Sequence, residues 1–356
     1  MDTLGTGSSG LSIALAQTFS PQLERQWNRK IHLVRQIPIS AETGFGNGYN
    51  IGWDVEFSGA DAKPFAEGLD VQASEASQDV NTKATLNWGL YRSVFHLSNL
   101  EINAARANQG NARQLEDIVG ERVVGALSKI AEAVESDVFV GTGTGTGPDA
   151  QPAPTIVGLD VVLTSTGNYG GLARTDHAEW ASTVSSHGGI ARPLTLDLMA
   201  VTEESIFNAY GESPNLLVTT AGIHTKYEGM FNSTVRTVSD GQGPIQGFHG
   251  SSDRLYWRGD RIVRARKATS GNLYMLNTNE LELRVLPYAA VPDGVAVRQV
   301  NAIDSNGTAI ENAPILLHVY PLARMGSSVK FAVEVQIQLK VKRPNAHARI
   351  ADILQS

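Results

Sequence analysis

Residues 158–182 read GLDVVLTSTGNYGGLARTDHAEWAS and hold the most informative pattern in the chain. Tyr169 is followed directly by Gly170 and Gly171, and then by Arg174 and Trp180. Adjacent glycines let the backbone adopt positive φ, which other residues reach only at a cost. An aromatic ring close to such a turn can be buried against it. We therefore predict a structural turn locked by a buried ring, and no ligand site.

A glycine–threonine stretch, VFVGTGTGTGPDAQPAP, precedes this turn at residues 138–154. Glycine-rich loops hold phosphate where their N–H groups converge at the start of a helix. This stretch instead follows a helical pattern and runs into prolines, which have no N–H to donate. The chain contains no Gly-Lys dipeptide, so the lysine of a phosphate-binding loop is missing, and the glycine spacing does not match a dinucleotide fingerprint. We interpret the stretch as a flexible connector.

The composition is that of a globular protein whose 356 residues can bury a large core. A formal charge of −7 argues against broad affinity for nucleic acid or anionic membranes. The absence of cysteine excludes disulfides, thiolate metal sites and a cysteine nucleophile. No apolar run approaches the roughly 20 residues that a membrane span needs, so no membrane partner is expected.

Known catalytic and metal-binding motifs are missing from the sequence. Neither H-E-x-x-H nor G-x-S-x-G occurs, and the eight histidines are scattered. His177 and His187 lie in loop-like sequence, and we expect Glu203 and Glu204 to be solvated on a helix. We assign no catalytic, cofactor-binding or metal-binding residue and expect no cofactor. Catalytic groups can converge from distant positions, so a soluble α+β enzyme stays open as an alternative.

Two segments of alternating polarity predict the strands of a long hairpin. The apolar positions of the first are Ile51, Trp53, Val55 and Phe57. Those of the second, in residues 81–97, are Ala84, Leu86, Trp88 and Leu90. Between them, residues 58–80 carry five acids and one lysine and hold few apolar side chains. A tip of this composition is expected to reach outward, to water or to another molecule.

A long amphipathic helix is predicted at residues 112–137. Its apolar positions recur at helical spacing: Leu115, Ile118, Val119, Val123, Leu127, Ile130 and Val134. A second helix is predicted from an N-cap at Thr195 to about Tyr210. The expected inner face of that helix consists of Leu198, Met199, Ile206 and Phe207.

Short strands and one more helix are predicted around and after these segments. The strand NLLVTT at 215–220 is followed by a helix that begins at Thr220. Further strands are expected in the segments RLYW, RIVRA, NLYMLN and LELRVL. The last strand, residues 329–341, places every odd-numbered residue on one apolar face, so we expect it to be half-buried.

The stretch from Arg254 to Lys267 has six basic residues in fourteen. It fits either a patch for nucleic acid or an acidic partner, or the solvated face of a β-hairpin. We favour the solvated hairpin, because the chain as a whole is acidic.

The turn of residues 158–182 resembles a segment of the major capsid proteins of tailed bacteriophages with the HK97-type fold. The matching residues are Tyr169, Gly170, Gly171, Leu172, Arg174 and Trp180. LTLDLM, NLLVTT and LYMLNTNELELRVLP then follow in the order seen in that family. The resemblance covers residues 112–356 well and the first hundred residues by layout only.

This resemblance implies an α+β, HK97-like capsid fold with five parts. They are an N-terminal arm at 1–40, the E-loop hairpin and its base at 41–98, a peripheral domain at 99–193, an axial domain at 194–320, and C-terminal strands of the peripheral domain at 321–356. Residues 112–137 would be the spine helix of the peripheral domain, which also carries an antiparallel sheet.

The resemblance also implies contacts between subunits through the E-loop. The candidate contact residues are Asp61, Lys63, Phe65, Glu67, Asp70 and Glu75. Some relatives join subunits by a Lys–Asn isopeptide bond, and Lys63 and Lys83 lie near the hairpin. Surface lysines are common, so we do not expect such a crosslink here.

The implied function is that of a structural major capsid protein without enzymatic activity. It would assemble into hexamers and pentamers of an icosahedral shell that encloses double-stranded DNA without sequence-specific binding. Expected partners are a separate scaffolding protein, a portal protein and a decoration protein. The scaffolding protein is expected to be separate because no helical segment precedes the arm. The expected location is the virion capsid, assembled in the host cytoplasm. An encapsulin-type nanocompartment remains the alternative with the same fold.

Overall fold

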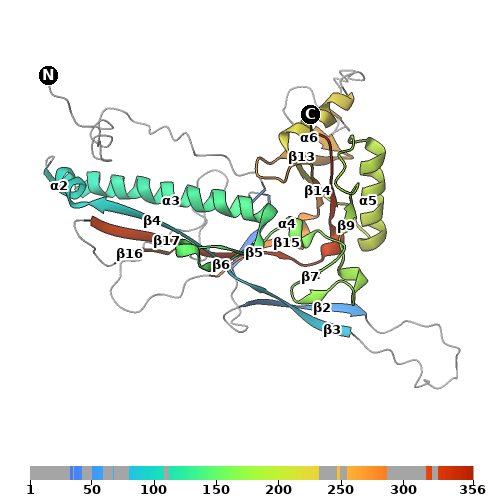
Figure 1. Cartoon of the computed structure of the whole chain (residues 1–356), viewed down its shortest axis with the longest axis horizontal. Coiled ribbons are helices and arrows are strands. Elements are labelled where there is room, and N and C mark those ends of the chain that lie inside the picture. Colours follow the sequence, from blue (N-terminus) through green and yellow to red (C-terminus); the bar gives the residue numbers. More distant parts are fainter. Residues whose placement is uncertain are drawn as a thin grey trace. The chain divides into compact units, whose positions relative to one another are not determined.

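The computed structural model describes residues 33–34, 36–41, 50–58, 67, 80–107, 112–231, 247–248, 255–286, 318–322 and 328–355. They fall into two compact units (Figure 1). The first unit is built from residues 90–135 and 285–337, and the second from residues 32–89, 136–284 and 338–356. The unit boundary falls within helix α3 (Ala112–Val140) and within strand β17 (Ser328–Val341).

The first unit combines strands with helical segments. Strands β4 (Gly89–Ser98) and β16 (His318–Pro321) both pair with β17. The rings of Phe95 and Phe331 stack at 5.3 Å between centroids. Helix α2 (Asn99–Ala107) follows β4, and Arg122 of α3 forms an ion pair with Glu101 of α2 at 2.7 Å.

Helix α3 extends three residues beyond the end that the sequence pattern predicts. Its buried side chains in the first unit include Val123, Ala126, Ile130 and Val134, which recur every three or four residues. Leu127 is only half-buried, and the side chains of Leu115, Ile118 and Val119 lie outside the described ones.

A two-stranded hairpin of β2 (Asn50–Ser58) and β3 (Val80–Asn87) belongs to the second unit. The strands are antiparallel, with Asn50 opposite Asn87 and a bulge near Glu56. The prediction of one strand over residues 81–97 is wrong. The chain leaves β3 at Trp88 and enters β4, where the alternation changes phase, so that Leu90 is 49% exposed.

A seven-stranded sheet forms the larger core of the second unit, in the order β11-β12-β13-β10-β14-β18-β9. In chain order its strands are β9 (Thr183–Ser185), β10 (Leu216–Thr219), β11 (Gly247–Phe248), β12 (Leu255–Trp257), β13 (Asp260–Arg264), β14 (Leu273–Leu276) and β18 (Ala348–Ile350). Residues 348–350 thus share a sheet with strands of the expected axial domain. The domain boundaries expected from the sequence stay a prediction.

Helices α5 (Leu196–Tyr210) and α6 (Ala221–Phe231) pack against this sheet in one hydrophobic core. The predicted cap of α5 is confirmed, because the Thr195 hydroxyl accepts the N–H of Leu198 at 3.2 Å. Phe207 is 53% exposed, so its predicted place on the inner face is wrong. Thr202 and Glu203 are buried instead, since they share the side of the helix that carries Met199 and Ile206.

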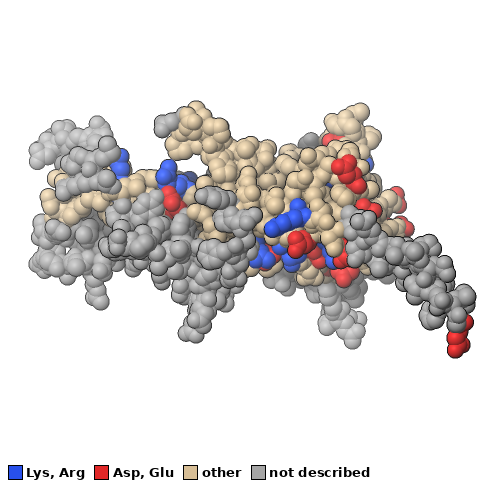
Figure 2. Space-filling view, turned by 90° about the horizontal axis from the view of Figure 1, so that it is seen from below, with Lys and Arg blue, Asp and Glu red and all other residues tan. Residues whose placement is uncertain are grey.

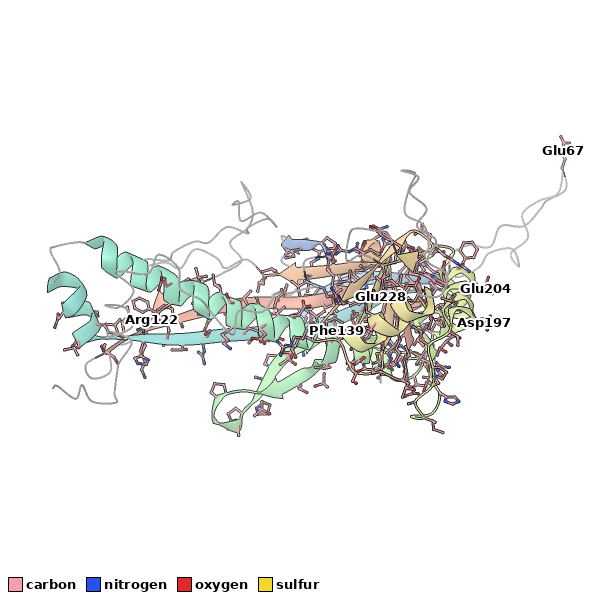
Figure 3. The ribbon with its side chains drawn as sticks, turned by 90° about the horizontal axis from the view of Figure 1, so that it is seen from above. Glu67, Arg122, Phe139, Asp197, Glu204 and Glu228 are labelled. Carbon is pink, nitrogen blue, oxygen red and sulfur yellow. The ribbon has the colours of Figure 1, made fainter. Side chains whose placement is uncertain are left out.

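Glu203 is buried, which corrects the expectation that both glutamates of this pair are solvated. Its carboxylate accepts a hydrogen bond from Trp257 Nε1 at 2.6 Å and lies 3.3 Å from the Arg258 guanidinium. Glu204 is exposed as expected and points outward from α5 (Figure 3).

The basic stretch folds as the β-hairpin that we favoured. Leu255, Trp257, Ile262 and Val263 are buried, whereas Arg258 and Arg261 are exposed. Arg254 lies outside the described residues. On the face that Figure 2 shows, basic side chains of the described residues lie beside acidic ones.

The last residues of β17 pair with β15 (Leu281–Val285), which in turn pairs with β1 (Ile39–Ala41). The expectation of a half-buried strand holds only for the beginning of β17. From Ile337 onward both faces are covered, and even Gln338 and Lys340 are buried.

The glycine–threonine stretch forms a small hairpin, so its interpretation as a flexible connector is wrong. Strand β5 (Thr142–Thr146) pairs antiparallel with β6 (Pro152–Val157), and the 3-10 turn η3 (Pro148–Ala150) joins them. Alternating glycines leave room for the partner strand, and Gly143 has a φ of +84°, next to the register shift.

Short elements complete the second unit. They are α4 (Leu159–Val162), β7 (Asn168–Tyr169), β8 (Leu172–Ala173), η4 (Ala178–Trp180), η5 (Thr278–Glu280) and η6 (Pro344–Ala346). Within the described part of the chain, no helix is both long and apolar enough to cross a membrane.

Candidate functional site: the root of the β2–β3 hairpin

The double-glycine turn links β7 to β8. Gly170 and Gly171 have φ values of +63° and +82°, which side chains other than glycine rarely adopt. Tyr169 and Trp180 are each 2% exposed, and their rings lie 5.8 Å apart. Trp180 Nε1 donates to the Tyr169 carbonyl at 3.0 Å, and the Tyr169 hydroxyl accepts the Val341 N–H at 2.9 Å. Both aromatic side chains therefore have hydrogen-bond partners as well as packing partners.

Arg174 holds the segment around this turn together from inside. Its guanidinium donates to the backbone carbonyls of Val162 at 2.5 Å, Thr166 at 3.1 Å and Trp180 at 3.2 Å. Burial lowers the pKa of Arg174, because removal from water disfavours the charged form. The fork geometry of the guanidinium suits three carbonyls from different directions, a role that lysine could not fill.

The turn also supports the β2–β3 hairpin. Thr85 of β3 donates its N–H to the Gly170 carbonyl at 2.8 Å. A Cβ at Gly170 would lie only 3.0 Å from the Cβ of Ala84, so glycine permits this close approach as well as the positive φ. At Gly171 the nearest atom would be 3.8 Å away, which leaves the φ as the only restriction.

Two aromatic side chains of β2 pack onto the same turn. Trp53 lies 6.1 Å from the Tyr169 ring, and Phe57 meets Trp180 edge-on at 5.8 Å. Phe57 also stacks on the His177 imidazole at 3.9 Å. We call this group the hairpin root: Trp53, Phe57, Ala84, Tyr169, Gly170 and Trp180. Sequence reasoning missed that the hairpin packs on the turn, although the alternating aromatic positions of β2 could have suggested it.

Gln338 fixes the other end of the hairpin. This fully buried side chain donates from Nε2 to the Asn87 carbonyl at 2.6 Å and accepts the Val157 N–H at 2.9 Å. One amide of β17 therefore connects the end of β3 to β6.

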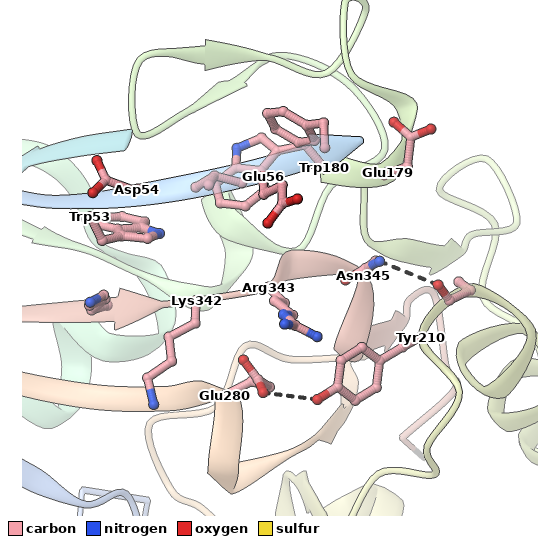
Figure 4. Close-up of a pocket in the computed structure, with 14 residues that line it drawn as sticks. Trp53, Asp54, Glu56, Glu179, Trp180, Tyr210, Glu280, Lys342, Arg343 and Asn345 are labelled. Carbon is pink, nitrogen blue, oxygen red and sulfur yellow. Dashed lines mark hydrogen bonds between the residues drawn. The ribbon is translucent and has the colours of Figure 1, made fainter. Parts of the chain in front are cut away.

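A cavity of about 740 Å³ lies beside the hairpin root (Figure 4). Its lining combines aromatic rings with charges of both signs: Trp53, Asp54, Val55, Glu56, Phe57, Glu179, Trp180, Ala209, Tyr210, Glu280, Lys340, Lys342, Arg343 and Asn345. The Tyr210 hydroxyl donates to Glu280 at 2.8 Å. Burial and this carboxylate together raise the pKa of Tyr210 to about 12.

The described residues that line the cavity show neither a histidine-based nucleophile pair nor a metal-binding cluster. Among the described residues of its lining there is no serine, threonine or histidine, so none of them forms a nucleophile paired with a histidine base. Among the residues that the structure describes, no three histidine or acidic side chains cluster to hold a metal ion. The mixed charges also differ from the uniformly basic lining of a phosphate site.

Of the six predicted E-loop contact residues, only Glu67 is among the residues that the structure describes. Glu67 is exposed and is labelled in Figure 3. Asp61, Lys63, Phe65, Asp70 and Glu75 lie outside the described residues. Their contacts with a neighbouring subunit stay a prediction. Lys83, by contrast, is described and lies exposed on β3.

Comparison with protein families gives a match to a family described as SU10 major capsid protein, over residues 103–354. None of the curated proteins matches the sequence significantly.

Several solved structures share the fold. The chain is similar to a protein of the cyanophage A-1(L) capsid asymmetric unit, with a TM-score of 0.72, 15% identity, and 93% of this chain and 95% of that one covered. It is similar to the capsid protein of an empty GTA particle with a TM-score of 0.54 and 11% identity, covering 94% of this chain and 100% of that one. It is also similar to a chain of the holo-SrpI encapsulin complex from Synechococcus elongatus PCC 7942, with a TM-score of 0.51 and 10% identity, covering 95% of this chain and 94% of that one. The α+β, HK97-like fold expected from the sequence is thereby confirmed.

Proposed function

The chain belongs to the family of SU10 major capsid proteins, and we propose that its copies assemble as hexamers and pentamers of an icosahedral shell around double-stranded DNA. It is a structural subunit of a virion capsid, and we infer no enzymatic activity. The match over 252 residues, from 103 to 354, carries this conclusion.

The construction of the β2–β3 hairpin supports assembly through contacts between subunits. The hairpin is a sheet of its own that packs on the body of its subunit through its root. Its tip, residues 59–79, carries five acids and few apolar side chains, so it has little to contribute to a core. We propose that this tip lies across a neighbouring subunit, where many modest contacts add up over the shell.

The charge of the subunit supports a container for DNA that does not bind it tightly. At −7 per chain, hundreds of copies repel the phosphate backbone and let the genome slide during packaging and release. We therefore propose that isolated subunits bind duplex DNA only weakly at physiological salt. Submicromolar affinity would contradict this and would restore the basic stretch as a nucleic-acid patch.

Membership of a capsid family supports a proposal of further partners. We propose a separate scaffolding protein, a portal protein and a decoration protein as partners, with assembly in the host cytoplasm. We also propose the division into arm, E-loop, peripheral and axial domains that the resemblance implies.

A nanocompartment around a protein cargo is the second candidate, because the chain shares its fold with an encapsulin at a TM-score of 0.51. Size-exclusion chromatography and negative-stain microscopy of the purified protein test whether shells form at all. Nuclease digestion of particles from the native source then separates the two candidates. DNA of genome length protected from nuclease supports the virion, whereas a protected protein cargo without DNA supports the nanocompartment. A small discrete oligomer with a saturable ligand would contradict both.

A further inference from the structure

The small hairpin of β5 and β6 has one closed outer edge, along β6. In an antiparallel pair, alternate residues point their N–H and C=O groups away from the partner strand. Pro152 and Pro154 lie opposite Thr146 and Thr144, at positions where an outward N–H would otherwise be free. Nearer the base of the hairpin, the N–H of Val157 is bound by Gln338 Oε1. The outer edge of β6 therefore offers no free donor at these positions.

The outer edge of β5 is open. Gly147 donates its N–H across the hairpin to the Gln151 carbonyl at 2.7 Å. Because the direction alternates along a strand, the backbone N–H and C=O groups of Thr146 and Thr144 point away from β6. Within the described residues, no acceptor is found for the N–H of either threonine. The Thr144 carbonyl accepts the Thr142 hydroxyl at 2.7 Å and keeps a second lone pair. Both threonines are exposed.

We propose that β5 pairs antiparallel with β5 of a second copy of this chain, around a two-fold axis at Gly145. The two hairpins then form a four-stranded sheet in the order β6-β5-β5-β6. In this register Thr144 exchanges both backbone hydrogen bonds with Thr146 of the second copy. The Cα atoms of a pair that lacks backbone hydrogen bonds approach to about 4.5 Å, and glycine at the axis leaves this approach free of side chains.

A second copy fits this edge better than another strand for two reasons. Residues 142–146 read TGTGT and hold no charge, so two identical strands do not repel each other, and opposed threonines form favourable cross-strand pairs. The pairing is also limited to two copies, because both outer edges of the new sheet are β6 edges, which offer no free donor to a further strand. The proposal rests on the proposed function, since a shell supplies the second copy.

Cysteine crosslinking tests the register directly, because the chain contains no cysteine. In the double variant Thr144→Cys/Thr146→Cys, the two positions face each other across the axis with Cα atoms about 5.5 Å apart, within reach of a disulfide. Oxidised shells should run mainly as covalent dimers on a non-reducing gel. The variant Lys226→Cys, exposed on α6, controls for random crosslinking and should stay monomeric. Equal crosslinking of both variants, or none in the double variant, would overturn the proposal.

A proline substitution tests the hydrogen bonds themselves. Thr146→Pro removes one outward N–H, whereas Thr146→Val keeps it and changes the side chain to a similar extent. Both variants should melt like the parent, but shells of Thr146→Pro should fall apart at lower urea concentration than those of Thr146→Val. Equal shell stability would overturn the pairing while leaving the proposed function intact. A parent chain that forms no shells would instead overturn the proposed function, and this proposal with it.

Discussion

The β2–β3 hairpin and the β5–β6 hairpin of the second unit are held in place by different means. The β2–β3 hairpin packs aromatic side chains, Trp53 and Phe57, against a turn whose own rings are buried. The β5–β6 hairpin has glycine, threonine and proline in place of such rings, and backbone hydrogen bonds together with the Gln338 amide hold it. One hairpin is fixed by packing and the other by hydrogen bonds.

The difference predicts how each hairpin responds to substitution. The stabilisation from packed rings increases with the apolar area that they bury, so removing one ring lowers the free energy of unfolding by a large amount. A hydrogen bond contributes less net stability, but a buried group left without its partner carries a desolvation cost. We therefore expect large effects at the root of β2–β3, intermediate ones at Gln338 and small ones at the hairpin tips.

Removing the Trp180 ring should have the largest effect. Trp180→Ala deletes a side chain that packs on Phe57 and Tyr169, and it should lower the free energy of unfolding by about 3–5 kcal/mol. Glu179→Ala, one residue earlier and exposed, is the matched control and should change stability little. Urea denaturation followed by circular dichroism measures both. Equal midpoints for the two variants would show that the root is not held by packing.

The two glycines of the turn should differ from each other. Valine at either position is strained by about 1–3 kcal/mol at positive φ. Gly170→Val adds a collision with Ala84 of β3, whereas Gly171→Val meets no atom closer than Thr85 Oγ1. Yield of soluble protein and thermal melting should therefore fall further for Gly170→Val. If Gly171→Val is the more harmful, the contact between turn and hairpin matters less than the structure suggests.

At Gln338 the expected loss is intermediate. Gln338→Leu leaves the Asn87 carbonyl and the Val157 N–H without partners and should cost about 1–3 kcal/mol. Gln336→Leu, two residues earlier on β17 and half-buried, provides the control. Hydrogen exchange should speed up at Val157 in the first variant only. Unchanged exchange there would mean that another group satisfies β6.

The sequence predicted what local patterns can determine. Alternation located β2, and the threonine before LDLM located the start of α5, because each depends on residues that are neighbours in the chain. The break at Trp88 was missed, since the choice between two sheets is made by pairing with β17, far away in sequence. Glu203 was misplaced for a similar reason, because its partner Trp257 lies 54 residues away. The candidate site depends on such distant contacts, so the turn and the hairpin could each be recognised from the sequence, but not that one packs on the other.

Acidic pH should lower the stability of the second unit, to which both hairpins belong. His347 is fully buried, its Nδ1 accepts the Asn277 N–H, and burial lowers its pKa to about 3. The unfolded chain, with a histidine pKa near 6.5, binds the proton first, so stability is complete above about pH 6.5 and declines as the pH falls toward 3. At pH 5.5 the free energy of unfolding is lower than at neutral pH by about 1.4 kcal/mol, which corresponds to a melting temperature lower by about 2–4 °C. In His347→Asn the change in melting temperature between pH 7.5 and 5.5 should shrink. An unchanged pH dependence would show that other groups cause it.

The tip of β2–β3 should affect the stability of the fold least and assembly most. Replacing Gly59–Gln78 with a short Gly-Ser turn leaves Trp53, Phe57 and the rest of the root in place. Shortening a surface loop lowers the entropy cost of closing it by only about 1–2 kcal/mol, so the variant should melt no lower than the parent. Shell formation should nevertheless fail or give fragile particles, because four of the five acids of the tip are then missing from the contact with a neighbour.

Circular dichroism melting alongside light scattering during assembly separates these effects. Parent shells should also weaken as salt is raised, if the acids of the tip meet basic partners at exposed rims. A matched control replaces the five acids of the tip with their amides and keeps its length, which tests charge apart from reach. A shortened variant that unfolds would place the tip in the core of its own subunit. One that still builds stable shells would show that assembly relies on other surfaces, and the open edge of β5 would then be the first to examine.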